Sequence, residues 1–115
     1  MNHMTEYLKH KVLTDNLKTN KVYVGLFNDA TEVKQASYKR QEVVFDTPAT
    51  GQTSNTADIL FPVAAESWGN ITHVGIFDAL TEGNTLFYSP AEFEKTIDVS
   101  SQYKIPKNYL IVRLK

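Results

Sequence analysis

The sequence predicts a mainly β protein, an antiparallel, jelly-roll-like β-sandwich preceded by one N-terminal α-helix. Seven short segments rich in β-branched and aromatic residues follow one another, with turn-forming residues between them. A helical spacing of apolar residues occurs near the N-terminus and nowhere else, which argues against a βαβ fold. A chain of 115 residues suits a single domain over residues 1–115, with the helix at 5–18 and the sandwich at 21–115.

The helix predicted at residues 5–18 is amphipathic. Charged and polar side chains fill one side, and Thr5 is the type of residue expected at an N-cap. Asn20 is expected to adopt the left-handed conformation that ends many helices. The apolar stripe on the other side must be covered by a neighbouring molecule or by the chain's own sandwich, and the sequence favours neither. Its members, the candidate docking residues, are Tyr7, Leu8, Val12, Leu13 and Leu17.

Period-two patterns and turn residues divide the rest of the chain into strands. The seven strands are predicted at 21–27, 38–45, 56–61, 70–78, 85–89, 93–99 and 109–115. Residues 46–55 are expected to form a loop, because turn-forming and small residues dominate there. In the last strand Leu110, Val112 and Leu114 share one face. The residues expected in the core include Phe27, Phe61, Ile76, Phe77, Val99, Leu110 and Val112.

A short internal repeat relates two of the predicted strands. The segment Val24-Gly25-Leu26-Phe27 matches Val74-Gly75-Ile76-Phe77, and Thr31-Glu32 and Tyr38 match Thr81-Glu82 and Tyr88 in the same register. Glycine weakens a strand interior unless something needs the space. Gly25 and Gly75 are therefore predicted to mark a bulge or a close approach of the backbone. The two strands are predicted to occupy related places in the sandwich.

Composition and motifs indicate no catalytic, metal or cofactor site. The net charge of −1 offers no basic field for nucleic acid. No apolar run approaches the ~18 residues of a membrane span, so membrane insertion is not expected. With no cysteine there is no thiolate metal site, and His3, His10 and His73 lack metal-ligand spacing. No serine lies in a nucleophile motif. The chain is therefore not expected to be an enzyme.

Three aromatic residues are candidates for an exposed binding surface: Trp68, Tyr103 and Tyr109. Aromatic platforms bind sugars or single-stranded nucleic acid by stacking. Most other aromatic residues occupy apolar strand positions and are expected in the core. Trp68 precedes Gly69 at the entrance of a predicted strand, where the alternative is that it plugs the end of the sandwich.

The order of motifs resembles that of a family of small proteins of tailed bacteriophages, the tail-fibre-like or minor tail proteins. The resemblance covers nearly the whole chain. Its most specific part is Trp68-Gly69 followed by Thr72-His73-Val74-Gly75-Ile76-Phe77-Asp78. Further matches are Tyr7-Leu8, Val12-Leu13-Thr14-Asp15, Val22 to Phe27, Phe61-Pro62-Val63-Ala64 and Gly83 to Tyr88.

The resemblance implies a structural virion protein docked on the phage tail, with no catalytic residues to carry over. The alternatives are a capsid decoration or head-fibre protein, or a receptor-binding module that contacts a host-surface glycan. We expect synthesis in the host cytoplasm, because the N-terminus lacks the apolar segment of a secretory signal. The expected partners are other virion proteins and further copies of the chain, with a trimer favoured by the symmetry of phage appendages.

Overall fold

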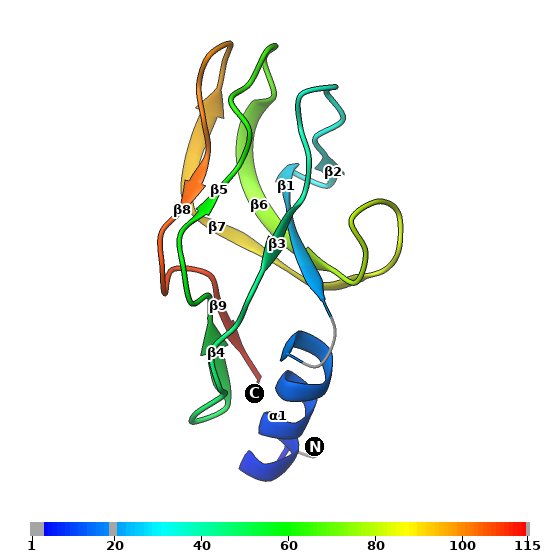
Figure 1. The fold of residues 1–115 in the computed structure, drawn as a ribbon, viewed down its shortest axis with the longest axis vertical. Helices are drawn as coiled ribbons and strands as arrows, with labels where there is room; N and C mark the ends of the chain where they lie inside the picture. Colours follow the sequence, from blue (N-terminus) through cyan, green and yellow to red (C-terminus); the bar gives the residue numbers. More distant parts are fainter. Residues whose placement is uncertain (1–3, 19–20, 115) are drawn as a thin grey trace.

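The computed structural model describes residues 4–18 and 21–114 (Figure 1). It is elongated, with extents of 45 × 28 × 24 Å. Within the described residues, α1 (Glu6–Leu13) continues into a π-helical segment, η1 (Thr14–Lys18), and strands make up the rest of the regular structure. The strands are β1 (Val22–Asn28), β2 (Thr31–Glu32), β3 (Gln41–Val43), β4 (Gln52–Ser54), β5 (Ile59–Leu60), β6 (Gly69–Phe77), β7 (Thr85–Ile97), β8 (Lys104–Ile105) and β9 (Ile111–Arg113).

One larger sheet and two small ribbons form the β structure. The larger sheet has the order β2-β1-β6-β7, and β3 also pairs with β1. The ribbons are β4-β9 and β5-β8. All pairs are antiparallel. The predicted fold class, a mainly β antiparallel protein with one N-terminal helix, is confirmed.

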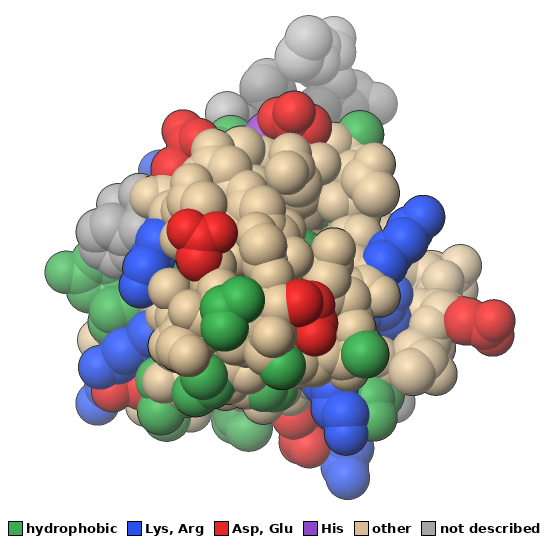
Figure 2. Space-filling view, turned by 90° about the horizontal axis from the view of Figure 1, so that it is seen from above, with side chains coloured by type: hydrophobic (Ala, Val, Ile, Leu, Met, Phe, Trp, Pro, Cys, Tyr) green, Lys and Arg blue, Asp and Glu red, His purple; other side chains and the backbone are tan. Residues whose placement is uncertain are grey.

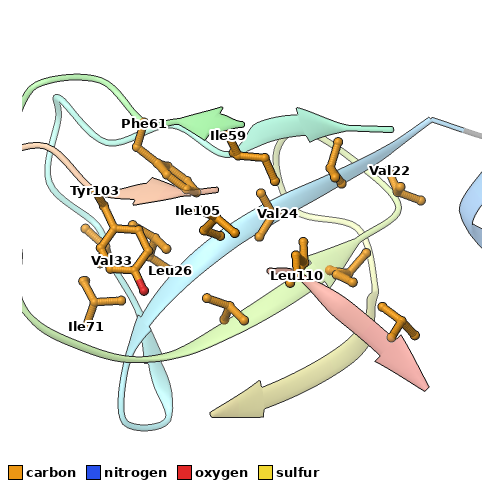
Figure 3. Packing of buried hydrophobic residues seen from close by; sticks show 14 of the residues in the cluster. Val22, Val24, Leu26, Val33, Ile59, Phe61, Ile71, Tyr103, Ile105 and Leu110 are labelled. Carbon is orange, nitrogen blue, oxygen red and sulfur yellow. The ribbon is translucent and has the colours of Figure 1, made fainter. Parts of the chain in front are cut away.

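The hydrophobic core lies between the larger sheet and the two ribbons. β1 and β6 contribute alternate residues, as a strand with one buried face should. Figure 3 shows side chains of β1 facing those of β5, β8 and the segment leading into β9. The best-buried members include Val22, Val24, Leu26, Phe45, Phe61, Ile71 and Ile97, joined by Leu13 and Leu17 from the helical segment.

Several predicted strand boundaries are wrong. Residues 85–89 and 93–99 belong largely to one strand, because β7 pairs with β6 on both sides of an irregularity at residues 91–94, which absorbs the register shift. The predicted loop at 46–55 contains β4, which β9 stabilises by pairing. The predicted strands at 38–45 and 56–61 shrink to β3 and β5, and β8 was not predicted. Short strands of this kind depend on a distant partner more than on their own residues.

The helical segment has the predicted extent, but it is an α-helix only in its first part. Thr5 is its N-cap, as expected, and its hydroxyl accepts a hydrogen bond from the Leu8 N–H at 3.2 Å. Regular α-helix ends at Leu13, and the chain continues in π-helical conformation to Lys18. The predicted cap residue Asn20 lies outside the described residues.

Most of the named core residues are buried as predicted. Phe27 and Phe77 are buried on the face of the larger sheet that points away from the main core. Val99 is exposed, contrary to the prediction, because β7 ends at Ile97 and Val99 lies in the following turn. Gly25 and Gly75 pair directly with each other between β1 and β6. The space that a β-carbon would need is taken by the Phe77 ring at Gly25 and by the Phe27 ring at Gly75.

Candidate functional site

The molecule has two different ends, and each is a candidate for contact with a partner. α1 lies at one end of the long axis, and connecting loops form the other (Figure 1). The last described residue, Leu114, donates its N–H to the Gly51 carbonyl at 2.9 Å. Gly51 in turn donates its own N–H to His10 of the helix at 3.1 Å. Both ends of the described chain therefore belong to the helix end.

Hydrogen bonds and apolar contacts fasten the helical segment to the sandwich. Leu13 and Leu17 are fully buried in the core. Lys18 donates from Nζ to the Phe45 carbonyl at 3.1 Å. This part of the predicted docking stripe therefore covers the chain's own core.

The other part of the stripe faces outward. Tyr7 is 77% exposed and Leu8 is 42% exposed, while Val12 is half-buried. The structure thus divides the five candidate docking residues. Tyr7 and Leu8 form the outward apolar part, and they are available for contact with another molecule.

The loop end is held together by polar contacts among three loops. Ser37 donates its hydroxyl to Glu66 at 2.5 Å and accepts from the indole N–H of Trp68 at 2.9 Å. Ala64 accepts from Ser100 at 2.7 Å and donates to Ser101 at 2.9 Å through backbone groups. Hydrogen bonds from Ser37 hold the pKa of the Glu66 carboxyl below its usual range. The three loops therefore form one connected tip.

The surface of this tip is mixed in character. Val63 and Val99 are exposed there, on the two loops that Ala64 and Ser100 join. Figure 2 shows the molecule from this end, with hydrophobic and acidic side chains among backbone and polar atoms and basic side chains toward the rim. Neither valine was predicted to be at the surface. The alternation of apolar and polar residues predicts which side of a strand is exposed, but it does not predict the exposure of a side chain at the tip of a loop.

A charged clamp joins β2 to the loop between β6 and β7. Arg40 donates two hydrogen bonds to the Glu32 carboxylate, both at 2.8 Å. It also donates to the carbonyls of Ala79 at 2.9 Å and Glu82 at 2.7 Å. Its guanidinium carbon lies 3.6 Å from the centre of the Phe77 ring. This bidentate, stacked arrangement is specific to arginine.

Tyr38 completes the clamp. Its hydroxyl donates to Glu32 at 2.6 Å and accepts the N–H of Leu26 at 3.0 Å. Burial acts to raise the pKa of Glu32, but hydrogen bonds from Arg40 and Tyr38 outweigh it and leave the pKa below the ordinary value. Burial and the Glu32 hydrogen bond raise the pKa of Tyr38 far above its usual range. The clamp is a structural network in which each member is paired.

A hollow of about 360 Å³ opens beside this clamp. Its rim includes Lys34, Lys39 and Leu80, and the two lysine ammonium groups have no hydrogen-bond partner among the described residues. The charges at its base, Glu32 and Arg40, are already paired with each other. The groups available to a ligand at the rim include these two cations, the exposed Leu80 and one further charge, the exposed carboxylate of Glu82.

Two of the three predicted surface aromatics are buried. Trp68 packs edge-on against Tyr38, with ring centroids 5.5 Å apart, and plugs the sandwich at the loop end. Tyr103 packs against Phe61, with ring centroids 6.1 Å apart. It comes directly before β8, a strand that was not predicted and that holds this part of the chain against the core. Tyr109 is exposed. Tyr88, which was not singled out, is exposed as well and stacks on His73 at 4.9 Å.

Among residues 4–18 and 21–114, no group of three or more His, Asp or Glu side chains is placed to hold a metal ion. None of the described helices is long and apolar enough to cross a membrane.

Residues 3–113 match the model of a family described as podophage GP4 fiber I protein gp80. No curated protein matches the chain. The matched region includes the whole sandwich and the helix.

Proposed function

Because the chain belongs to the family of the podophage GP4 fiber I protein gp80, we propose that it is a tail-fibre component that docks through its helix end. The family makes the chain a structural component of a phage virion. The finer proposal is that the helix end contacts the tail and that the loop end points outward. In this role the chain acts as a binding surface and not as a catalyst.

The asymmetry of the two ends carries this proposal. Tyr7 and Leu8 offer apolar surface at the helix end, where the rest of the helical segment is anchored in the core. A fixed helix that keeps an apolar face outward is suited to docking in a groove of a partner. The loop end lies at the far end of the 45 Å axis and is free to contact other molecules.

Paired surface variants test the proposal. Deletion of residues 1–18 would remove Leu13 and Leu17 from the core, so point variants are the better choice. Tyr7→Ser with Leu8→Ser changes the helix end, and Val63→Ser with Val99→Ser changes the tip. All four side chains are exposed, so folding should tolerate both changes.

The measurement is the amount of the chain in purified phage particles that carry each variant. We expect the helix-end variant to be depleted from particles while the tip variant is incorporated normally. Depletion of the tip variant alone, or normal incorporation of both, would contradict docking through the helix end. Cross-links from the helix end to a capsid protein would instead favour the decoration alternative.

The hollow beside the Arg40 clamp supports a second candidate function, recognition of a host-surface glycan. Lys34 and Lys39 place two cations at its rim beside one anion, Glu82, and this excess of positive charge suits an acidic sugar. The double variant Lys34→Ala/Lys39→Ala should lose binding to acidic glycans on an array. Lys104→Ala is the control, because Lys104 lies at an exposed ion pair elsewhere. Equal binding by the wild type and both variants would exclude this function for the hollow.

A further inference from the structure

The strand at one margin of the larger sheet has a free edge. β7 follows β6 at the end of the strand order, and it pairs with β6 alone. Among the described residues, no backbone hydrogen bond joins residues 85–89 to a strand other than β6. Pro90, which has no N–H donor, ends this stretch. Residues 85–89 therefore present backbone donors and acceptors that a further strand could use.

An apolar groove runs along the same edge. Two hollows of about 90 and 270 Å³ lie between β7 and β9, and both are lined by Val74, Ser89, Leu110 and Ile111. Within residues 4–18 and 21–114, β9 pairs only with β4, so it too has an open edge here. Val74 and Leu110 belong to the core, which means that the groove reaches the sandwich interior.

Exposed apolar side chains surround this groove. Ile111 is 49% exposed and lines both hollows. Tyr109 is exposed to a similar degree and lines the smaller hollow. A partner on this edge would cover both side chains while it paired with the backbone.

The charge pattern favours an identical copy as this partner. Residues 83–91, Gly-Asn-Thr-Leu-Phe-Tyr-Ser-Pro-Ala, carry no charge. Arg113 is the single charged residue among those that line the two hollows. Two copies of a charged edge would repel each other, whereas two copies of this edge would not.

We infer that residues 85–89 of two copies pair in antiparallel fashion about a two-fold axis and cover the groove between β7 and β9. In this arrangement one larger sheet continues into the other, and the β7 edge of each copy is paired. The contact is closed, so it yields a dimer and not a filament. The inference concerns the free protein and does not depend on docking through the helix.

This contact differs from the trimer expected from the resemblance. A threefold assembly needs two different surface patches that meet head to tail. The β7 edge is instead complementary to itself, which is the requirement for a two-fold contact. The molar mass of the protein in solution distinguishes a dimer from a trimer.

The first test is the mass of the full chain in solution, measured by light scattering after size-exclusion chromatography. We expect twice the 13.0 kDa of one chain. Ile111→Lys, at the groove, should convert the dimer to a monomer. Leu60→Lys is the matched control, since Leu60 is 53% exposed on β5 and should leave the dimer intact. A monomeric or trimeric wild type would overturn the inference, and so would dissociation by Leu60→Lys alone.

The second test uses the absence of cysteine from the chain. If the pairing is centred on Phe87, Thr85 of one copy lies opposite Ser89 of the other. The variant Thr85→Cys/Ser89→Cys should then form a covalent dimer on mild oxidation. The two cysteines of one copy would lie about 13 Å apart along a strand, beyond the about 7 Å limit for a disulfide, so any bond joins two copies. Tyr7→Cys/Val63→Cys is the control, because these exposed residues lie at opposite ends of the 45 Å axis and cannot form a bond within one copy. Equal cross-linking of both variants would overturn the inference.

Discussion

Phe27 and Phe77 stack face to face, with ring centroids 5.9 Å apart and ring planes 9° apart. They occupy equivalent positions of the sequence repeat and lie over Gly25 and Gly75, which are direct partners in the β1–β6 pair. An antiparallel pair centred on equivalent residues relates the two copies of the repeat by a local two-fold rotation. The repeat is therefore built into the centre of the larger sheet.

Replacing Gly75 with alanine should destabilise the protein. A β-carbon at this position would lie 2.7 Å from Cε1 of the Phe27 ring, which cannot move freely because it stacks on Phe77. We expect Gly75→Ala to lower the free energy of unfolding by about 1–3 kcal/mol, the usual cost of overpacking. Urea denaturation measures this change.

The double variant Gly75→Ala/Phe27→Ala tests the cause of that effect. Removing the Phe27 ring opens the space that the new methyl group needs. The glycine substitution should therefore cost less in the Phe27→Ala background than in the wild type, since the two residues are in contact. Equal costs in the two backgrounds would show that the ring is not the reason for the glycine.

Removing the Arg40 side chain should be among the most damaging single changes. Arg40→Met leaves the Glu32 carboxylate without its bidentate partner and frees the carbonyls of Ala79 and Glu82. We expect a loss of about 1.5–3 kcal/mol, the range for hydrogen bonds to a charged group, because the Glu32 side chain is only partly buried beside the hollow. Lys104→Met, which breaks an exposed pair with Asp58, should cost less than about 1 kcal/mol. Similar losses for the two variants would contradict this ranking.

The clamp also predicts how stability depends on pH. The pKa of Glu32 in the folded protein lies below its ordinary value of 4.5. The stabilisation from this carboxylate is therefore complete above the unfolded pKa and is lost as the pH falls through the folded pKa. The wild type should lose stability between neutral pH and pH values below about 4. Glu32→Gln should be less stable at neutral pH and show a smaller loss on acidification, and an unchanged slope would contradict the assignment.

Trp68 should report directly on the loop end. It is the single tryptophan of the chain, and it is buried against Tyr38. Its fluorescence should be blue-shifted in the folded protein and move to the red on unfolding. Ser37→Ala removes the acceptor of the indole N–H and should cost about 1–3 kcal/mol, because a buried donor is left unpaired. Red-shifted emission from the folded protein would show that Trp68 is exposed.

Sequence reasoning succeeded where a pattern is local. β1 and β6 are long, rich in β-branched and aromatic residues, and bounded by turns, so their own residues predict them. Thr5 was identified as the N-cap for the same reason. The equivalence of Gly25 and Gly75 came from the repeat alone, although their direct pairing could not be read from it.

Sequence reasoning failed where structure depends on distant contacts. β4 and β8 are very short, and pairing with β9 and β5 creates them. Tyr103 was placed at the surface because β8 was not predicted. The clamp was missed entirely, since Glu32 and Arg40 are unremarkable charged residues in a polar stretch until the fold brings them onto Phe77. The groove beside β7 was also missed, because it forms where the edge of the larger sheet lies next to the β4-β9 ribbon.

A density map of the intact virion tests the central claim most directly, the claim that this fibre protein docks through its helix end. The 45 Å length and the distinct ends make the orientation of the chain recognisable in such a map. We predict that α1, with Tyr7 and Leu8, contacts the tail and that the tip carrying Val63 and Val99 points away from the particle. A map in which the tip contacts the particle and α1 faces solvent would contradict the account.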